Sequence, residues 1–177
     1  MCSVGARKED PVVSSASWAV SRAIRPIVVL AVMLAASVGA AAEPALELVG
    51  TNPSLVRALS LEDLAALPQV VVKTENEFSD GVVSYRGPLA RDVLAELGLE
   101  RLNTVRLVAA NDYYVDIPTS DFADYDVILA MEADGKPLSR RDKGPLWLMY
   151  PITDNDALRD PIYLRRLIWQ VVRIEAL

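Results

Sequence analysis

Short apolar runs that end at turn-forming residues recur throughout residues 43–177, and they constrain the fold more than any other feature of the sequence. Such runs, rich in β-branched and aromatic side chains and bounded by Gly, Pro, Asn or Asp, are typical of strands. Asp80-Gly81 and Asp134-Gly135-Lys136-Pro137 are two of the turns. The runs predicted to form strands are residues 43–49, 69–74, 82–85, 104–109, 114–117, 127–131, 146–150 and 168–174.

Two short helices are predicted between these strands. Ser60 can cap the free amides of a helix that runs to Leu67, and the acidic residues that follow Ser60 favour the positive helix end. The second helix begins at Leu89, and Gly98 lies where a left-handed C-cap belongs. Many strands around few helices predict a mixed, strand-rich single α+β domain with two or three short helices.

Residues 1–42 have the features of a secretory signal peptide. Basic residues precede an apolar run that is shorter than the about 20 residues of a typical membrane span. An Ala-rich stretch just before Glu43 offers a cleavage site, and an uncleaved signal anchor is the alternative. Arg22 and Arg25 are not adjacent, which favours Sec-type export in the unfolded state. We therefore expect residues 43–177 to form a periplasmic domain with no membrane span after cleavage.

The composition of this domain excludes several classes of function. Without the four basic and two acidic residues of 1–42, 14 of the 18 Lys and Arg and 22 of the 24 Asp and Glu remain, for a formal net charge of −8. An acidic domain repels nucleic-acid phosphate, so nucleic-acid binding is not expected. The chain has no histidine, and its one cysteine is Cys2. The domain therefore cannot use a Ser–His–Asp triad, a Cys–His pair or a zinc site rich in His or thiolate.

Two polar clusters are candidates for a binding site. The first contains Asn111, Asp112 and Tyr113, between two predicted strands. Because Asn and Asp favour tight turns, this cluster is either the tip of a hairpin or one wall of a pocket. In a pocket, its side chains would supply hydrogen bonds to a ligand.

The second cluster is the cationic segment 140–143. Arg141 and Lys143 could hold an anionic group, because Arg can bind phosphate or carboxylate through two parallel hydrogen bonds. The alternative is a solvated loop or an internal network of ion pairs with nearby acids. Those acids are Asp142, Asp154 and Asp156.

The segment 140–143 leads into an apolar strand that Pro151 stops. Trp147 lies in this strand, and Trp169 lies in the last predicted strand. Large aromatic residues in strands belong more often to a core than to a ligand platform, so both are predicted to be core residues.

Motifs spread over nearly all of the domain resemble those of a known family. In chain order they are Tyr85-Arg86-Gly87-Pro88-Leu89, Ala110-Asn111-Asp112-Tyr113, Asp116-Ile117-Pro118, Asp134-Gly135-Lys136-Pro137-Leu138, Asp142-Lys143-Gly144-Pro145-Leu146-Trp147, Tyr150-Pro151 and 169–175. The sequence resembles the oxidoreductase molybdopterin-binding domain, and most closely its small stand-alone exported members. The resemblance implies the fold of the sulfite-oxidase type.

The sequence departs from this family at the residue that ligates the metal. In catalytic members, a cysteine thiolate in a strand-to-loop segment before the first helix of the domain ligates molybdenum, and residues 71–76 resemble that segment. No thiol follows Cys2, and neither Lys73 nor Thr74 can replace a soft thiolate with equivalent metal chemistry. Molybdopterin is the cofactor that the resemblance implies, but its usual ligand is missing, and we expect no cofactor.

We interpret the chain as a periplasmic, non-catalytic ligand- or partner-binding module, with an accessory or sensing role, on a molybdopterin-binding oxidoreductase fold. It is expected to bind a small anionic ligand, or a periplasmic or membrane partner protein. The predicted pocket residues are Arg86, Asn111, Asp112, Tyr113, Arg141 and Lys143. No catalytic or metal-binding residue is predicted. Two alternatives stay open: a molybdopterin-dependent oxidoreductase, or a subunit of one, with a non-cysteine metal site, and a scaffold without a small-molecule ligand.

Overall fold

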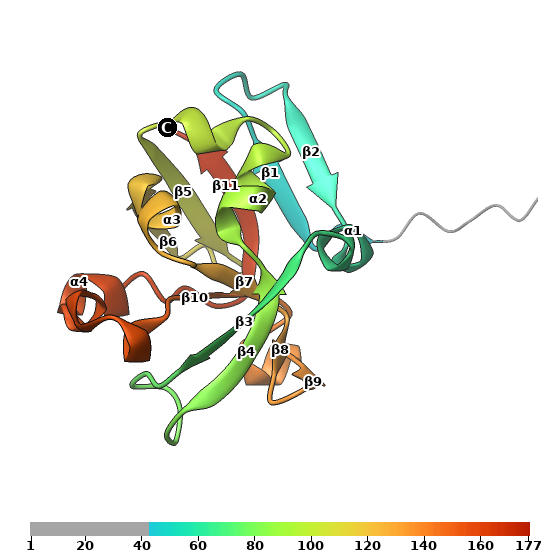
Figure 1. The fold of residues 1–177 in the computed structure, drawn as a ribbon. Helices are drawn as coiled ribbons and strands as arrows, with labels where there is room; N and C mark the ends of the chain where they lie inside the picture. Colours follow the sequence, from blue (N-terminus) through green and yellow to red (C-terminus); the bar gives the residue numbers. More distant parts are fainter. Residues whose placement is uncertain (1–42) are drawn as a thin grey trace, which may run out of the picture. The chain divides into compact units, whose positions relative to one another are not determined.

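The computed structural model describes residues 43–177, so the predicted signal peptide lies outside the described part of the chain. The described residues form a mixed, strand-rich α+β fold, as the sequence predicts (Figure 1). The strands are β1 (Leu46–Val49), β2 (Val56–Leu59), β3 (Gln69–Thr74), β4 (Val83–Pro88), β5 (Thr104–Ala109), β6 (Tyr114–Pro118), β7 (Ile128–Ala130), β8 (Glu132–Ala133), β9 (Lys136–Pro137), β10 (Trp147–Met149) and β11 (Val171–Ala176). The α-helices are α1 (Leu61–Ala66), α2 (Ala90–Ala95), α3 (Ser120–Asp124) and α4 (Pro161–Leu164). Four 3₁₀ helices complete the described part: η1 (Leu99–Arg101), η2 (Arg140–Asp142), η3 (Ile152–Asp154) and η4 (Asp156–Arg159).

The strands form three sheets. The largest has the order β2-β1-β11-β5-β6, in which β1 and β11 are parallel and the other neighbours are antiparallel. A four-stranded antiparallel sheet has the order β3-β4-β8-β9, and β7 pairs with β10 in the third sheet. An isolated bridge between Leu89 and Ile128 connects the end of β4 to β7. The β3–β4 hairpin extends away from the five-stranded sheet (Figure 1).

Most elements agree with the sequence prediction, and β3 and β5 begin and end at the predicted residues. Five of the strands and α-helices are not predicted: β2, β8, β9, α3 and α4. Each is two to five residues long, which is too short for a helical or strand-like hydrophobic period to be visible. The part of the chain that the structure describes therefore has four short α-helices, where the sequence predicts two or three. None of these helices is long and apolar enough to cross a membrane.

Helix α1 begins at the predicted cap. The amide of Asp63 donates to the Ser60 hydroxyl (3.1 Å), and the Ser60 amide donates to the Asp63 carboxylate (2.8 Å). This reciprocal pair is a capping box, which satisfies two amides that the helix itself cannot. The backbone amide and hydroxyl of Ser60 favour the charged carboxylate, so they lower the pKa of Asp63.

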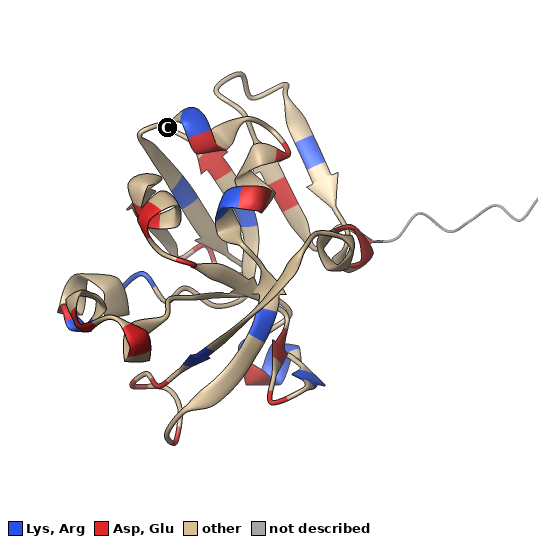
Figure 2. Cartoon of the chain, in the orientation of Figure 1, with Lys and Arg blue, Asp and Glu red and all other residues tan. Residues whose placement is uncertain are grey.

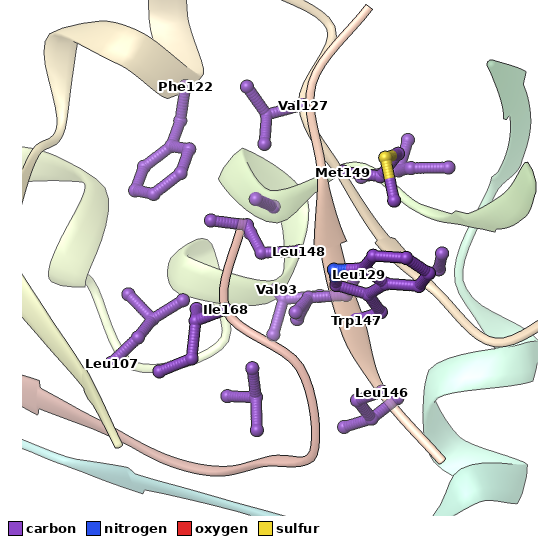
Figure 3. Packing of buried hydrophobic residues seen from close by; sticks show 14 of the residues in the cluster. Val93, Leu107, Phe122, Val127, Leu129, Leu146, Trp147, Leu148, Met149 and Ile168 are labelled. Carbon is purple, nitrogen blue, oxygen red and sulfur yellow. The ribbon is translucent and has the colours of Figure 1, made fainter. Parts of the chain in front are cut away.

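The core brings together side chains from α2, β5, β7 and β10 (Figure 3). Val93, Leu107, Leu129 and Leu148 are fully buried there. Trp147 of β10 is also buried, at 3% exposed, which confirms its prediction as a core residue. Charged residues of both signs are interspersed along the helices, strands and loops (Figure 2).

Two glycines, each in one of the motifs that resemble the known family, permit close backbone packing. A Cβ at Gly87 would collide with the carbonyl oxygen of Leu129, and a Cβ at Gly144 would collide with that of Leu138. A larger residue at either position would force the neighbouring strand or turn to move. These glycines are therefore required by packing, independently of any ligand.

Candidate functional site

A cleft of about 300 Å³ lies beside the β3–β4 loop, the β5–β6 hairpin and the segment that follows α4. Its polar lining comes from Glu77, Asn111 and Arg165. The rest of the lining is apolar or aromatic: Phe78, Ala109, Tyr113, Leu164, Leu167, Ile168 and Trp169. We call this site the aromatic cleft. Its volume lies at the lower end of the range typical of small-molecule sites, about 300–1,000 Å³.

Aromatic rings form one wall of the cleft. The rings of Phe78 and Trp169 meet edge-to-face with 5.2 Å between centroids, and Trp169 meets Trp147 at 6.4 Å. Tyr85 packs behind Trp147 with 5.5 Å between ring centroids, and burial raises the pKa of the Tyr85 hydroxyl. Phe78 and Trp169 are each 37% exposed. The prediction that Trp169 is a core residue is therefore wrong, because its ring lies at the edge of this cluster and lines the cleft.

Lys143 holds the aromatic wall together. Its Nζ atom lies 4.8 Å from the Trp147 ring centroid and 5.5 Å from that of Phe78, within the range of cation–π attraction. The same ammonium group donates a hydrogen bond to the Phe78 carbonyl oxygen (3.2 Å). Lys143 thus fixes the β3–β4 loop against the rings, and its charge has partners within the protein.

The cluster of Asn111, Asp112 and Tyr113 is both a hairpin tip and a wall of the cleft. The Asn111 side-chain oxygen accepts from the Tyr113 amide (3.3 Å), which forms an Asx turn, and Asp112 has a φ of 63°, a left-handed conformation that Asp tolerates. Ala109 and Tyr113 close the hairpin through a backbone hydrogen bond (2.8 Å). Asn111 and Tyr113 line the cleft, whereas Asp112 is exposed and does not.

Gln170 brings the two predicted clusters together. Its carbonyl oxygen accepts from the Ala110 amide (2.9 Å), and its own amide donates to the Lys143 carbonyl (3.1 Å). Its side chain donates to the Arg140 carbonyl oxygen (2.6 Å). Gln170, which has a φ of 52°, therefore links the β5–β6 hairpin to the cationic segment 140–143, called the cationic loop below.

The remaining predicted pocket residues lie elsewhere. Arg86 pairs with Glu132 across β4 and β8, with 2.9 Å between nitrogen and oxygen. Arg141 lies exposed in η2 and does not line the aromatic cleft. Within residues 43–177, no ion pair joins the segment 140–143 to Asp154 or Asp156, so the internal network considered as an alternative does not form there.

The segment that resembles the metal-ligating segment contains a buried threonine. Thr74 is fully buried, and its hydroxyl oxygen accepts from the amides of Ile152 (3.1 Å) and Thr153 (3.4 Å). The hydroxyl donates to the Glu75 carbonyl (3.3 Å). A hydroxyl so occupied is a structural group, and a neutral hydroxyl is a poor substitute for a thiolate. The residues present at this position do not fit a molybdenum centre, and residues 43–177 hold no other cluster of acidic, His or Cys side chains suited to a metal.

A buried charged network lies beneath the segment that follows α4. The Asp121 carboxylate accepts from the Tyr150 hydroxyl (2.8 Å) and pairs with Arg166 (2.5 Å). The side chains of Asp121 and Arg166 are only 8% and 12% exposed. Burial, followed by the adjacent carboxylate, raises the pKa of Tyr150 well above its ordinary value. The network joins α3, β10 and the chain after α4, and therefore positions one side of the aromatic cleft.

Of the ten residues that line the cleft, the sequence prediction includes only Asn111 and Tyr113, and the residues it misses include Phe78, Arg165 and Trp169. Phe78 had a usable signal, since a large aromatic residue within the polar run 75–81 has no strand or helix of its own to bury it. Arg165 had none, because it is one of two adjacent arginines in a segment without a visible pattern. Its approach to the β5–β6 hairpin is a tertiary contact.

Comparisons with known proteins agree with this fold. The family model for the oxidoreductase molybdopterin binding domain matches residues 46–153, and the chain therefore belongs to this family. Among solved structures, the sulfane dehydrogenase SoxCD from Paracoccus pantotrophus is similar, with a TM-score of 0.53 and 19% sequence identity. The match covers 73% of this chain and 37% of the SoxCD chain. No curated protein matches this chain.

These matches establish the family and the sulfite-oxidase-type fold. The low identity to SoxCD limits that likeness to the fold. This chain spans little more than a third of the length of the SoxCD chain. Function must therefore be argued from the residues of this chain.

Proposed function

We propose that this protein is a non-catalytic binding module built on the molybdopterin-binding oxidoreductase fold. The observation that carries the proposal is the buried Thr74 hydroxyl, which binds two backbone amides in the segment that resembles the metal-ligating one. The absence of histidine from the whole chain, and of cysteine after Cys2, removes histidine bases, cysteine nucleophiles and thiolate metal ligands from this domain. What the domain retains is a pocket of ligand size.

The aromatic cleft supports a small ligand with an apolar or aromatic body and an anionic group. Trp169, Phe78 and Tyr113 offer flat apolar surfaces, and Asn111 offers hydrogen bonds at the edge. Arg165 lines the same cleft, and no ion pair within residues 43–177 engages its guanidinium. Arg165 therefore takes the anion-binding role, while Lys143 holds the wall of the cleft.

The predicted export of the chain supports an accessory or sensing role in the periplasm, as a domain that meets its ligand or partner outside the cytoplasm. This part of the proposal rests on the basic, apolar and Ala-rich pattern of residues 1–42. Cell fractionation with N-terminal sequencing of the purified chain tests it. An N-terminus near Glu43 in the periplasmic fraction supports it, and a full-length cytoplasmic chain contradicts it.

Membership of the family favours one alternative, a molybdopterin-dependent oxidoreductase with a non-cysteine metal site. Metal and pterin analysis separates the two functions. The full chain is expressed in a Gram-negative host with intact molybdenum-cofactor synthesis, and the folded protein is purified. We expect neither molybdenum nor pterin in stoichiometric amounts. Stoichiometric molybdenum with pterin would overturn the non-catalytic function.

Ligand-dependent thermal stabilisation tests the cleft. Indole-3-acetate and benzoate serve as first probes, with indole as an uncharged control. A ligand that binds only the folded state stabilises it by about 2.7 kcal/mol at 100 times its Kd. We expect stabilisation by a carboxylate probe that is lost in Trp169→Ala and reduced in Arg165→Gln.

The matched control for this experiment is Arg141→Gln, which removes an exposed arginine outside the cleft. It should leave the response to the probes unchanged. If Arg141→Gln abolishes the response and Arg165→Gln does not, the anion lies at the cationic loop, as the sequence analysis predicted. If neither aromatic carboxylate stabilises the protein at millimolar concentration, the proposed ligand class is wrong.

A further inference from the structure

Strand β3 is an open edge of the four-stranded sheet, because it pairs with β4 on one side only. On the far side of β4, the carbonyl oxygens of Ser84 and Arg86 accept from the amides of Asp134 and Met131. Backbone N–H and C=O groups alternate in direction along an antiparallel strand. The backbone groups of Val83, Tyr85 and Gly87 therefore point to the other side of β4 and hydrogen-bond β3. Tyr85 is paired with Val72 in the register. The N–H and C=O groups of Val71 and Lys73 consequently point out from the free edge.

This edge lacks several of the features that usually protect a strand from pairing with another chain. It contains no proline, and its register with β4 is continuous, without a bulge. Val71 is 54% exposed, and the Thr74 end of the strand is covered by the amides of η3. Lys73 is the single charged residue of the strand. A free edge of this kind is a template for an added strand.

Other edge strands of the described residues are less suitable. With six residues, β3 is the longest edge strand: β2 has four, β6 has five, β9 has two, and β7 and β10 have three each. Both β6 and β9 end in a proline, which cannot donate to a ladder.

A groove of about 270 Å³ runs beside the free edge of β3. Val70, Val71 and Val72 form one side of this groove. Its other side comes from the chain at the end of α3 and from η3, and includes Asp124, Asp126 and Asp154. We call it the acidic edge groove.

The charges in the acidic edge groove determine what can occupy it. Asp126 pairs with Arg91 (2.9 Å), but no ion pair within residues 43–177 engages Asp124 or Asp154. Two carboxylates therefore face solvent beside unpaired backbone groups. A second copy of this chain would bring its own Asp124 and Asp154 to the same place, and like charges oppose that contact. A basic segment would bring complementary charge.

We propose that the acidic edge groove binds an extended, basic segment of a partner protein, which adds to β3 as a further strand. The main-chain groups of Val71 and Lys73 would hydrogen-bond the added strand, and Asp124 and Asp154 would attract Lys or Arg side chains on it. This interaction is independent of the aromatic cleft, since no residue lines both sites.

Peptide binding to the purified protein tests the proposal. The probes are the fluorescein-labelled peptides (Lys-Val)₃ and (Glu-Val)₃, measured by anisotropy at two salt concentrations. We expect the basic peptide to bind at least about tenfold more tightly than the acidic one, and to weaken as salt rises. In ¹⁵N NMR spectra, the amides of Val71 and Lys73 should shift most. Equal affinity for both peptides, or shifts that map elsewhere, would overturn the proposal.

Two kinds of variant locate the interaction. Val71→Pro removes an outward amide that β4 does not use, so it should abolish binding while the fold persists. Its control is Val71→Thr, which keeps the amide and should bind normally. Asp124→Asn with Asp154→Asn should weaken binding at low salt without any change to the backbone. The matched control, Asp80→Asn with Asp112→Asn, removes two acids outside the groove and should bind as the unmodified protein does.

Three outcomes of these variants would refute the proposal. The first is a folded Val71→Pro variant that binds the basic peptide normally. The second is equal loss of binding in the groove variant and its charge-matched control. The third is concentration-dependent dimerisation that Val71→Pro abolishes, which would assign the edge to a second copy of the chain. The groove variant keeps the test decisive if Val71→Pro does not fold.

Discussion

Substitution of Asp121 by alanine should destabilise the protein more than any other single removal of a carboxylate from the described residues. Asp121 is the only acid among the buried residues of the described part, and its carboxylate serves both Tyr150 and Arg166. Without it, a guanidinium that is 12% exposed loses its counter-charge. The Tyr150 hydroxyl, which is fully buried, loses its hydrogen-bond acceptor at the same time.

The expected loss follows from this burial. Breaking a buried ion pair by removing one partner costs about 3–5 kcal/mol. We take this range to include the cost of leaving the Tyr150 hydroxyl without an acceptor, which is about 1–3 kcal/mol on its own. A domain of this size has a stability of about 5–15 kcal/mol, so the loss is a large fraction of the total. At about 4 °C for each kcal/mol, the Tm should fall by about 12–20 °C.

Urea denaturation followed by tryptophan fluorescence measures this loss. The control is Asp124→Ala, which removes an exposed acid from the same helix and should stay within about 0.5 kcal/mol of the unmodified protein. The double variant Asp121→Leu with Arg166→Met removes both charges and should recover most of the stability, because apolar replacements of buried pairs are often neutral. A loss below about 1 kcal/mol in Asp121→Ala, or a double variant as unstable as the single one, would refute the reasoning.

Three further predictions concern stability. Ser60→Ala should cost about 1 kcal/mol in urea titrations because it removes the α1 cap, whereas Ser60→Asn should cost little; equal losses would contradict this role of the side chain. Gly87→Ala drives a Cβ into the Leu129 carbonyl and should lower the free energy of unfolding by about 1–3 kcal/mol or more. Gly98→Ala, whose added Cβ enters open space at positive φ, should cost less, about 1–2 kcal/mol. The reverse order would refute the packing argument. The raised pKa of Tyr150 means that the folded state keeps a proton that the unfolded state loses near pH 10, so stability should fall as the pH rises above about 10. Chemical denaturation across that range should show a smaller fall in Tyr150→Phe, and an identical fall would contradict the assignment.

The sequence predicts a strand well where a run of strand-forming residues is bounded on both sides by turn-forming residues. The run Gln69–Thr74 is rich in β-branched residues between Pro68 and a polar loop, and it forms β3 with the predicted ends. The cap at Ser60 is also predictable, because it depends only on residues 60–63, which are adjacent in the sequence. Elements that depend on tertiary contacts, such as α3 and α4, leave no such pattern because neither completes two turns.

The candidate site is predictable only in part. The sequence marks Asn111, Tyr113 and Lys143 as polar residues near turns, and the structure places the first two in the aromatic cleft and the third behind its wall. It does not show that Lys143 is engaged by Trp147, or that Arg165 supplies the free cation of the cleft. Charge at a position is visible in a sequence, but whether that charge already has a partner is decided by packing between segments far apart in the chain.

The hydrogen bonds of Gln170 have a consequence for how the molecule opens. Because the Ala110 amide, the Lys143 carbonyl and the Arg140 carbonyl all bond this one residue, a displacement of Gln170 breaks the bonds that restrain both loops. Segments linked in this way open as one cooperative unit, and their amides exchange hydrogen with solvent together. The hairpin and the cationic loop, separated by about thirty residues of sequence, should therefore behave in hydrogen exchange as a single foldon.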